Sequence, residues 1–277
     1  MKMREKPVLQ VNNLYVRYGE GCPECESNME KNRCKVCGTV WAANDISLEV
    51  YPGEVLGIVG ESGSGKSTLM QSLYFDIEPT EGTAYLSGYK DGETNIWEVS
   101  AAEKRQIKNN VMGMVYQNPI RGLRMDYSSA SNIAEKIIAA GNRNATEMTQ
   151  RAKELLRAVE ILTSRMGEAP KNFSGGMQQR VQISKALANN PSILLLDEVT
   201  TGLDLSVQAK VLDLIRKIKN QYGISILLVS HDLAVIRMLA DRTVVMLDGK
   251  IIESGLTDQI LEDPQHAYTQ QLVHSLL

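Results

Sequence analysis

The stretch "GESGSGKS", residues 60–67, follows the apolar run "VLGIV" at residues 55–59 and precedes a segment with a helical pattern. It matches the motif G-x-x-x-x-G-K-[ST], in the strand-to-helix context that the motif requires. In such a loop, backbone N–H groups converge on phosphate oxygens, and the helix N-terminus adds positive potential. Gly63 and Gly65 allow a close approach of phosphates that a side chain would obstruct. The alternative is a chance glycine-rich turn, which the motifs farther along the chain disfavour.

The side chains of this loop predict a nucleotide bound together with a divalent cation. We expect Lys66 to reach the β- and γ-phosphates and Ser67 to place its hydroxyl on Mg²⁺. The residues predicted to surround the phosphates are Gly60, Glu61, Ser62, Gly63, Ser64, Gly65, Lys66, Ser67 and Thr68. The loop therefore predicts that the chain binds a nucleoside triphosphate with Mg²⁺.

Two acidic residues end the apolar run "SILLLDE" at residues 192–198. Because the carboxyl ends of parallel strands are where α/β sheets bind ligands, we expect Asp197 and Glu198 to meet the same nucleotide. Asp197 is predicted to hold Mg²⁺ through its water shell, and Glu198 to orient and deprotonate the attacking water. The alternative for this pair is a structural role at the N-terminus of the next helix.

The order of strand and helix patterns predicts an α/β fold. Strand-like runs near the start of the chain predict a small antiparallel β part. A helical subdomain is expected at about residues 100–173, beginning with a capping box formed by Ser100 and Glu103. The continuous apolar strands of the second half predict a parallel core, in which Gly223 ends one of the helices. We expect a single domain over residues 1–277.

The composition excludes several classes of protein. The chain has 277 residues, of which 43% are hydrophobic and 23% charged, as in an ordinary globular protein. Its formal net charge of −3 opposes a broad nucleic-acid surface, which would need a basic excess. No apolar run approaches the roughly 18 residues of a membrane span, and the first residues lack the apolar segment of a leader. We therefore expect a cytoplasmic protein that binds no nucleic acid and meets a membrane only through a partner.

Further stretches resemble one family. The sequence "FSGGMQQR", residues 173–180, is similar to the signature motif of ATP-binding-cassette (ABC) ATPases, and "EVTTGLD", residues 198–204, resembles that family's D-loop. Gln117 in "MVYQNP" resembles its Q-loop glutamine, and His231 in "LLVSHDL" resembles its switch histidine. These elements follow one another in the family's order. The resemblance implies a P-loop NTPase with a RecA-like core, an antiparallel β subdomain and a helical subdomain.

The resemblance also implies a mechanism, in which two cassettes pair head to tail with two ATP molecules between them. The pair is a homodimer or a dimer with a paralogue. Gln117 is implied to act in catalysis and to bind Mg²⁺, and His231 to contact the γ-phosphate. Tyr18 stands where this family stacks an aromatic ring on adenine. The residues implied to contact the ATP of the other subunit are Ser174, Gly175, Gly176 and Gln178. The alternatives are an ordinary surface or core histidine and an ordinary strand-end tyrosine.

Three positions depart from the commonest residues of the family. Phe173 and Met177 replace Leu and Gln in the signature motif, and Val199 replaces the Pro that usually follows the catalytic glutamate. None of these changes removes a catalytic group, so they leave the rate of hydrolysis open and not the chemistry. The presence of Lys66, Glu198 and His231 disfavours a scaffold that binds ATP without hydrolysing it.

Two stretches that vary among ABC ATPases indicate which subgroup of the family the chain resembles. The tail "ESGLTDQILEDPQHAYTQQLVHSLL", residues 253–277, resembles the tails of peptide- and nickel-importer cassettes. It looks still more like the ATP-binding component of bacterial carbon–phosphorus lyase systems. The stretch "NPIRGLRMDYSSASNIAEKI", residues 118–137, also resembles that component, since importer cassettes usually carry a "SLNP"-like sequence there. The resemblance thus favours the lyase system over an importer.

In the lyase system the cassette docks as a dimer on a soluble lyase core whose radical S-adenosylmethionine subunit cleaves the carbon–phosphorus bond. By this resemblance the segment from Asn118 to Glu135 contacts that partner. The alternative is the surface of a helical subdomain that faces a permease or nothing. An importer motor therefore remains the second interpretation.

All the cysteines of the chain lie in one short stretch with the spacing C-x2-C-x8-C-x2-C. They are Cys22, Cys25, Cys34 and Cys37. Two C-x2-C turns present four thiolates to a tetrahedral metal, and the eight intervening residues suffice for a short return hairpin. Zinc is the expected metal, and iron in the same S₄ geometry is an alternative. Disulfides and redox-active pairs are the other interpretations.

The cysteine stretch forms an insertion at residues 20–40, between Tyr18 and Trp41, where the usual family pattern moves directly to the next strand. It resembles a zinc-ribbon knuckle, and it is too short to fold without a metal. We expect a structural element that stiffens the adenine loop or contacts a partner. Catalysis by this metal is not expected, because four protein ligands leave no open coordination position.

Overall fold

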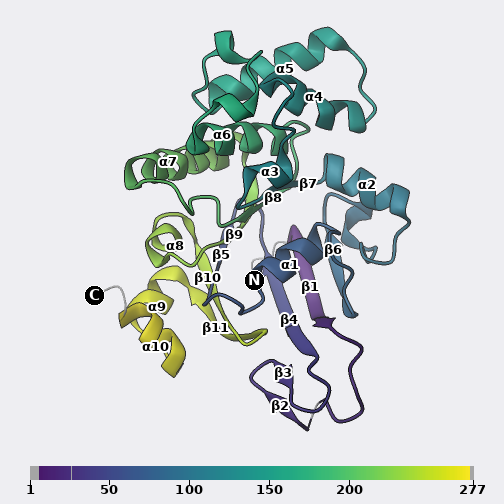
Figure 1. The fold of residues 1–277 in the computed structure, drawn as a ribbon, viewed down its shortest axis with the longest axis vertical. Helices are drawn as coiled ribbons and strands as arrows, with labels where there is room; N and C mark the ends of the chain where they lie inside the picture. The colour runs from purple at the N-terminus through teal and green to yellow at the C-terminus, as the bar shows by residue number, and fades with distance from the viewer. Residues whose placement is uncertain (1–5, 26, 275–277) are drawn as a thin grey trace. The chain divides into compact units, whose positions relative to one another are not determined.

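The computed structural model describes residues 6–25 and 27–274 (Figure 1). The expectations that concern residues 1–5, Glu26 and residues 275–277 lie outside the described part. Within that part, no helix combines the length and the apolar character that a membrane span requires.

The chain divides into two compact units. The first unit contains residues 1–99 and 228–277, and the second contains residues 100–227. The strands are β1 (Leu9–Tyr18), β2 (Met29–Glu30), β3 (Arg33–Cys34), β4 (Val40–Val50), β5 (Val55–Val59), β6 (Glu81–Leu86), β7 (Met112–Val115), β8 (Ile193–Asp197), β9 (Ser225–Val229), β10 (Arg242–Leu247) and β11 (Lys250–Leu256). The helices are α1 (Lys66–Leu73), α2 (Ala101–Asn110), α3 (Pro119–Gly122), α4 (Ser129–Ala139), α5 (Ala145–Ala158), α6 (Gly175–Ala186), α7 (Leu205–Tyr222), α8 (Leu233–Leu239), α9 (Thr257–Glu262) and α10 (Ala267–His274).

The first unit is built on an antiparallel sheet with the strand order β2-β3-β4-β1-β6. Its central pair, β1 and β4, extends from Leu9 opposite Val50 to Tyr18 opposite Val40, with register shifts between Val11 and Arg17. Side chains of β1 alternate between buried and exposed, as expected for a strand with one covered face. The short hairpin β2–β3 continues the sheet at the start of β4, where Arg33 on β3 pairs with Val40 (Figure 1). This is the hairpin predicted between the two C-x2-C turns.

Beside this sheet, the first unit contains a second group of strands in which β5 pairs parallel with β10, and β10 pairs antiparallel with β11. All five residues of β5 are buried, as is typical of a parallel strand covered on both faces. The start of β5 is anchored by Asp241, whose carboxylate accepts the backbone N–H of Val55 at 2.8 Å. These contacts fix the strand from which the phosphate-loop sequence departs.

In the second unit, the parallel strands β7 and β8 are accompanied by helices α2 to α7. The predicted capping box is confirmed, because the side chains of Ser100 and Glu103 each accept the backbone N–H of the other at the start of α2. Gly223 ends α7 in the left-handed conformation, also as predicted. The region from about residue 128 to 162 contains two α-helices, α4 and α5, since Asn144 caps the start of α5 after a break at Gly141.

Lys136 on α4 is buried in the second unit, with 7% of its surface exposed. Its amino group lies 3.3 Å from the carbonyl oxygen of Met112. Burial, reinforced by the positive charges of Lys185 and Lys108, lowers the pKa of Lys136 to about 7. Near neutral pH the native chain therefore holds this proton weakly, whereas the unfolded chain holds it firmly.

We expect Lys136→Met to remove one component of the pH dependence of stability. Between about pH 7 and pH 10, the unfolded lysine binds a proton that the native lysine releases, so the wild-type free energy of unfolding rises with pH. The variant lacks this rise and is more stable than the wild type at pH 7. Urea denaturation at pH 7 and pH 9.5 measures both effects. The exposed Lys210→Met is the matched control, and equal pH slopes in wild type and Lys136→Met would contradict the expectation.

Candidate functional site

The predicted phosphate loop is pressed against the backbone of its own unit. A Cβ atom on Gly65 would lie 1.9 Å from the carbonyl oxygen of Ala42 on β4. One on Gly60 would lie 2.2 Å from the carbonyl oxygen of Met246 on β10. Both glycines also have positive φ angles, of +101° and +152°. Gly63, with a φ of +85°, has open space around its Cα, so its role is conformational.

Lys66 is folded into this loop and only 5% exposed. Its amino group donates to the carbonyl oxygens of Gly60 and Glu61, both at 2.7 Å. Helix α1 begins at Lys66 with Gly65 as its N-cap, and it has neither a side-chain cap nor an acidic residue in its first turn. The loop therefore presents a helix N-terminus and an ammonium group, both of which favour an anion.

Tyr18, the predicted adenine contact, lies next to the phosphate loop in the first unit. It ends β1 with 48% of its surface exposed. Its hydroxyl lies 3.3 Å from the hydroxyl of Thr68, in the first turn of α1. The structure thus brings together an exposed aromatic ring and the residues of the predicted triphosphate site. An exposed ring beside a phosphate-binding loop can stack on a nucleobase.

A contact that the sequence did not reveal joins the loop to the C-terminal helix α10. The backbone N–H of Glu61 donates to the hydroxyl oxygen of Tyr268 at 2.9 Å. The segment that leads into α10 is seated by Glu253, whose carboxylate accepts the N–H groups of Gln265 at 2.8 Å and His266 at 3.0 Å. Burial raises the pKa of Tyr268, so the hydroxyl keeps its proton while its oxygen accepts the N–H of Glu61. No motif signals this pair, because its residues are 207 positions apart.

The second unit holds a separate cluster of predicted catalytic groups. The side-chain amide of Gln117 donates to Glu198 Oε2 at 3.1 Å, and the hydroxyl of Thr201 donates to the same oxygen at 3.2 Å. Glu198 has a φ of +47°, an uncommon conformation for a residue with a side chain. Asp197, at the end of β8, is 5% exposed. The predicted Q-loop and the predicted acidic pair therefore meet within one unit.

Two buried glutamines of α6 hold the backbone of the Q-loop. Gln182 accepts the N–H of Tyr116 at 2.7 Å and donates to the carbonyl oxygen of that residue at 3.1 Å. Gln179 donates to the carbonyl oxygen of Gln117 at 3.0 Å. Leaving a buried amide without a hydrogen-bond partner is costly, so these two side chains fix the position of Gln117 relative to α6.

The signature motif opens helix α6. Ser174 is the N-cap and accepts the N–H of Met177 at 3.4 Å, and both Ser174 and Gly175 are exposed. Gly176 is buried against α7, because a Cβ there would lie 2.3 Å from Val207 Cγ1. Ser174 and Gly175 thus remain available on the surface, while Gly176, the second glycine of the motif, is required by helix packing.

Three other residues of the motif, Gln178, Phe173 and Met177, make contacts inside the second unit. The amide of Gln178 donates to the carbonyl oxygens of Pro170 and Phe173, at 3.0 and 3.1 Å. The guanidinium of Arg165 lies 4.5 Å from the ring centroid of Phe173 and 3.5 Å from the sulfur of Met177. Both departures from the commonest signature residues therefore contact one arginine. That arginine was not identified from the sequence.

His231 lies in the first unit and is exposed just after β9. The preceding residue, Ser230, donates its N–H to the carbonyl oxygen of Ile58 on β5 at 3.1 Å. Asp232 then caps helix α8. The predicted switch histidine is thus held between a strand end and a helix start, with its side chain at the surface.

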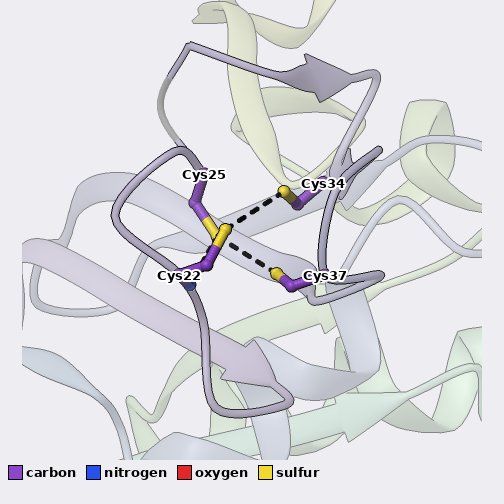
Figure 2. Close-up of side chains that lie close together, drawn as sticks. All are labelled: Cys22, Cys25, Cys34 and Cys37. Carbon is purple, nitrogen blue, oxygen red and sulfur yellow. Dashed lines mark hydrogen bonds between the residues drawn. The ribbon is translucent and has the colours of Figure 1, made fainter.

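The four cysteine sulfurs converge on one point (Figure 2). All of them lie within 4.8 Å of one another, and three of the separations are 3.5, 3.7 and 3.8 Å. A tetrahedral centre with Zn–S bonds of about 2.3 Å has S···S edges of about 3.8 Å. None of the four is in a disulfide. The arrangement therefore fits a tetrahedral thiolate metal site and excludes the disulfide interpretation in this structure.

Thr39 joins the two cysteine turns, and only 3% of its surface is exposed. Its hydroxyl accepts the N–H of Gly21 at 3.0 Å and lies 3.2 Å from the sulfur of Cys37. Its carbonyl oxygen accepts the N–H of Cys34 at 2.9 Å. Hydrogen bonding to Thr39 lowers the pKa of Cys37 to about 6, whereas burial raises that of Cys22 to about 12. Nothing in the spacing of the cysteines predicted this role for Thr39.

We expect Tyr268→Phe to weaken nucleotide binding, because Glu61 loses the acceptor that holds its N–H while the ring is kept. The dissociation constant for ATP should rise about 2–10-fold, the scale of one neutral hydrogen bond. Titration of both proteins with a fluorescent ATP analogue measures it. Tyr222→Phe, in the other unit, is the matched control. Unchanged affinity in Tyr268→Phe would show that this contact does not position the loop.

Comparisons with known proteins agree with this geometry. The family model described as "ABC transporter" matches residues 43–201, more than half of the chain. The phosphonates utilization ATP-binding protein PhnK of Escherichia coli (strain K12) is 40% identical over 272 residues, which cover 98% of each chain. The peptidoglycan transport ATP-binding protein YejF of Agrobacterium fabrum is 36% identical over 97% of this chain and 47% of its own length.

A solved structure shows the same fold. It is the dimeric, post-hydrolysis state of the ATP-binding cassette MJ0796 bound to ADP and phosphate. Its TM-score is 0.74 at 28% identity, covering 90% of this chain and 98% of that one. The expected fold, a P-loop NTPase of the ABC type with mixed α/β sheets, is thus confirmed. The chain belongs to the ABC transporter family and is an ABC ATPase.

Proposed function

We propose that this ATPase is the ATP-binding subunit of a carbon–phosphorus lyase system and couples ATP-driven dimer closure to phosphonate breakdown by a lyase core. The observation that carries the proposal is the 40% identity to PhnK over 98% of both chains. That relative is named for phosphonate utilization. The stretch at residues 118–137 and the tail at residues 253–277 support the same subgroup.

We propose that the residues predicted from the sequence bind and hydrolyse ATP. Lys66 neutralises the phosphates, and Mg²⁺ is held with the help of Ser67, Gln117 and Asp197. Glu198 is the general base. The hydrogen bond from Gln117 to Glu198 supports this assignment, because it orients a carboxylate beside a residue of the Q-loop. His231 contacts the γ-phosphate, and Tyr18 stacks on adenine.

A head-to-tail dimer completes this site in the proposal. The partner, a second copy or a paralogue, contributes Ser174, Gly175, Gly176 and Gln178 to the γ-phosphate. Ser174 and Gly175 are exposed at the start of α6, where backbone N–H groups attract an anion. The solved relative MJ0796 is itself described as dimeric. We propose a cytoplasmic location for the complex, where thiols such as the four cysteines stay reduced.

The segment from Asn118 to Glu135 is proposed to contact the lyase core. It follows the Q-loop and exposes two large apolar side chains, Ile120 and Tyr127. A cavity of about 550 Å³ lies at its end, lined in part by Tyr127, Glu135 and Ile138. Exposed apolar groups around a cavity are typical of protein–protein contact sites. We also propose that residues 1–277 form one ABC domain, with a helical subdomain at about residues 100–173.

We further propose that the four cysteines hold Zn²⁺ in the inserted loop at residues 20–40, with iron as the alternative metal. The convergence of four sulfurs at separations of 3.5–3.8 Å supports this proposal. Tetrahedral S₄ ligation suits both metals. With four protein ligands the metal has no open position, so its role is structural.

The second candidate is the motor of a peptide-type importer. The observation that favours it is the 36% identity to YejF, a peptidoglycan transport protein, over 97% of this chain. That match covers 47% of YejF, whereas the match to PhnK covers almost the whole relative. The two candidates predict different partners for the same ATPase.

We expect Glu198→Gln to bind ATP and to hydrolyse it at least about 100-fold more slowly, because the attacking water loses its base. ATP should then trap a dimer, measured by size-exclusion chromatography with light scattering. Affinity purification of tagged Glu198→Gln with ATP, from the native host, should retain soluble lyase subunits more strongly than the wild type does. Glu154→Gln, on the surface of α5, is the matched control.

Two results would contradict the proposal at different points. Normal hydrolysis by Glu198→Gln would remove the general-base assignment. Recovery of a hydrophobic permease from the membrane fraction, with no lyase subunits, would identify an importer motor. The ATPase itself would stand in both cases.

We expect the purified chain to contain about one zinc per molecule, because four converging thiolates bind this ion tightly. Plasma mass spectrometry measures zinc and iron together. Replacement of all four cysteines by serine should abolish the bound metal. Metal-free wild-type protein with four titratable thiols would contradict the site.

A further inference from the structure

The cysteine cluster and the proposed adenine contact are connected at one end of the antiparallel sheet. Tyr18, the last residue of β1, lies opposite Val40, the first residue of β4. The cysteine-bearing insertion leaves the sheet directly after Tyr18 and returns to it just before Val40. Whatever orders the insertion therefore acts on the end of β1 and on the start of β4, which lie opposite each other.

Thr39 contacts both the cysteine turns and the residue that follows Tyr18. A Cβ atom on Gly19 would lie 2.7 Å from the Thr39 hydroxyl oxygen, so the residue after Tyr18 is in close contact with Thr39. The same hydroxyl contacts Gly21 in front of the first cysteine turn and the sulfur of Cys37 in the second. One buried side chain thus links both cysteine turns to the residue that follows Tyr18.

The second cysteine turn also extends the sheet. Arg33 on β3 pairs with Val40, and the N–H of Trp41 donates to the carbonyl oxygen of Asn32 at 2.7 Å. Trp41 in turn lies opposite Arg17, the neighbour of Tyr18 on β1. The hairpin, β4 and the end of β1 therefore form one hydrogen-bonded unit.

The insertion has almost no apolar core of its own. Among its described residues 20–25 and 27–40, the buried side chains are those of Cys25, Cys34 and Thr39. Ordering a loop of this length costs conformational entropy that three small side chains do not offset. A metal on the four sulfurs supplies the missing stabilisation, and its loss releases the hairpin.

We propose that metal occupancy of the cysteine cluster sets the affinity for ATP by holding Tyr18 against the base. The proposal rests on the metal site and the Tyr18 contact proposed above. The phosphate loop is also anchored by Met246 on β10 and by Tyr268, neither of which belongs to the insertion, so metal loss acts on the base and leaves phosphate binding unchanged. Release of the metal to a chelator thereby lowers nucleotide affinity.

The test compares ATP with inorganic tripolyphosphate, which has three linked phosphates but lacks the adenosine. The full chain is stripped of metal with a chelator, which is then removed, and Mg²⁺ is restored. Dissociation constants are measured for ATP and for inorganic tripolyphosphate, before and after stripping. We expect the affinity for ATP to fall about tenfold, the scale of one base–aromatic stacking contact. The affinity for tripolyphosphate should stay unchanged, and added Zn²⁺ should restore ATP binding.

Variants separate this inference from the proposals beneath it. Tyr18→Ala, fully loaded with metal, should lose the same affinity for ATP, and stripping it should cause no further loss. Lys35→Ala, which removes an exposed ion pair with Glu30 on the hairpin, is the control and should behave as wild type. The variant with all four cysteines replaced by serine should match the stripped protein, provided circular dichroism shows a folded chain.

Each contradicting result has its own meaning. A purified chain without metal overturns the metal site and this inference together. Unchanged ATP affinity in Tyr18→Ala overturns the base contact and the inference with it. Bound metal and a Tyr18 effect, combined with equal ATP affinity of stripped and loaded protein, overturn this inference alone.

Discussion

The close approach of Gly65 to the backbone of β4 is the constraint on which the first unit depends. A single added methyl group would lie 1.9 Å from the carbonyl oxygen of Ala42, so the phosphate loop can only sit there as glycine. The loop then turns Lys66 inward onto its own carbonyl oxygens and starts α1 without a side-chain cap. The strand that supports the phosphates is also the one that begins beside Thr39 and the cysteine turns.

In the second unit, the Q-loop is positioned by side-chain hydrogen bonds and not by glycines. Gln179 and Gln182 fix the backbone of the Q-loop, and Gln117 then reaches Glu198. Helix α6 begins with the signature motif and also carries the two glutamines. A shift of α6 would therefore move the signature motif together with the Q-loop residue that contacts Glu198. Recognition of a neighbouring subunit and orientation of the carboxylate are therefore mechanically linked in the proposed mechanism.

Local patterns in the sequence predicted much of this structure, because the responsible interactions lie within a few residues. The loop at residues 60–67, the capping box at Ser100 and the convergence of the cysteines follow from spacing and turn chemistry alone. The contacts of Tyr268 and Thr39 could not be predicted in this way. Tyr268 meets a residue 207 positions away, and Thr39 acts through a backbone arrangement that exists only after β1 and β4 have paired. Local patterns also do not determine which metal the cysteines bind or which partner the chain contacts.

The most direct test of the central claim, that this ATPase drives phosphonate breakdown, is growth of the native host with Lys66→Ala in place of the wild-type chain. An alkylphosphonate and inorganic phosphate are compared as sole phosphorus sources. The account predicts normal growth on phosphate and none on the phosphonate, because the variant cannot neutralise the triphosphate. Normal growth on the phosphonate, together with loss of growth on peptides as the nitrogen source, would contradict it.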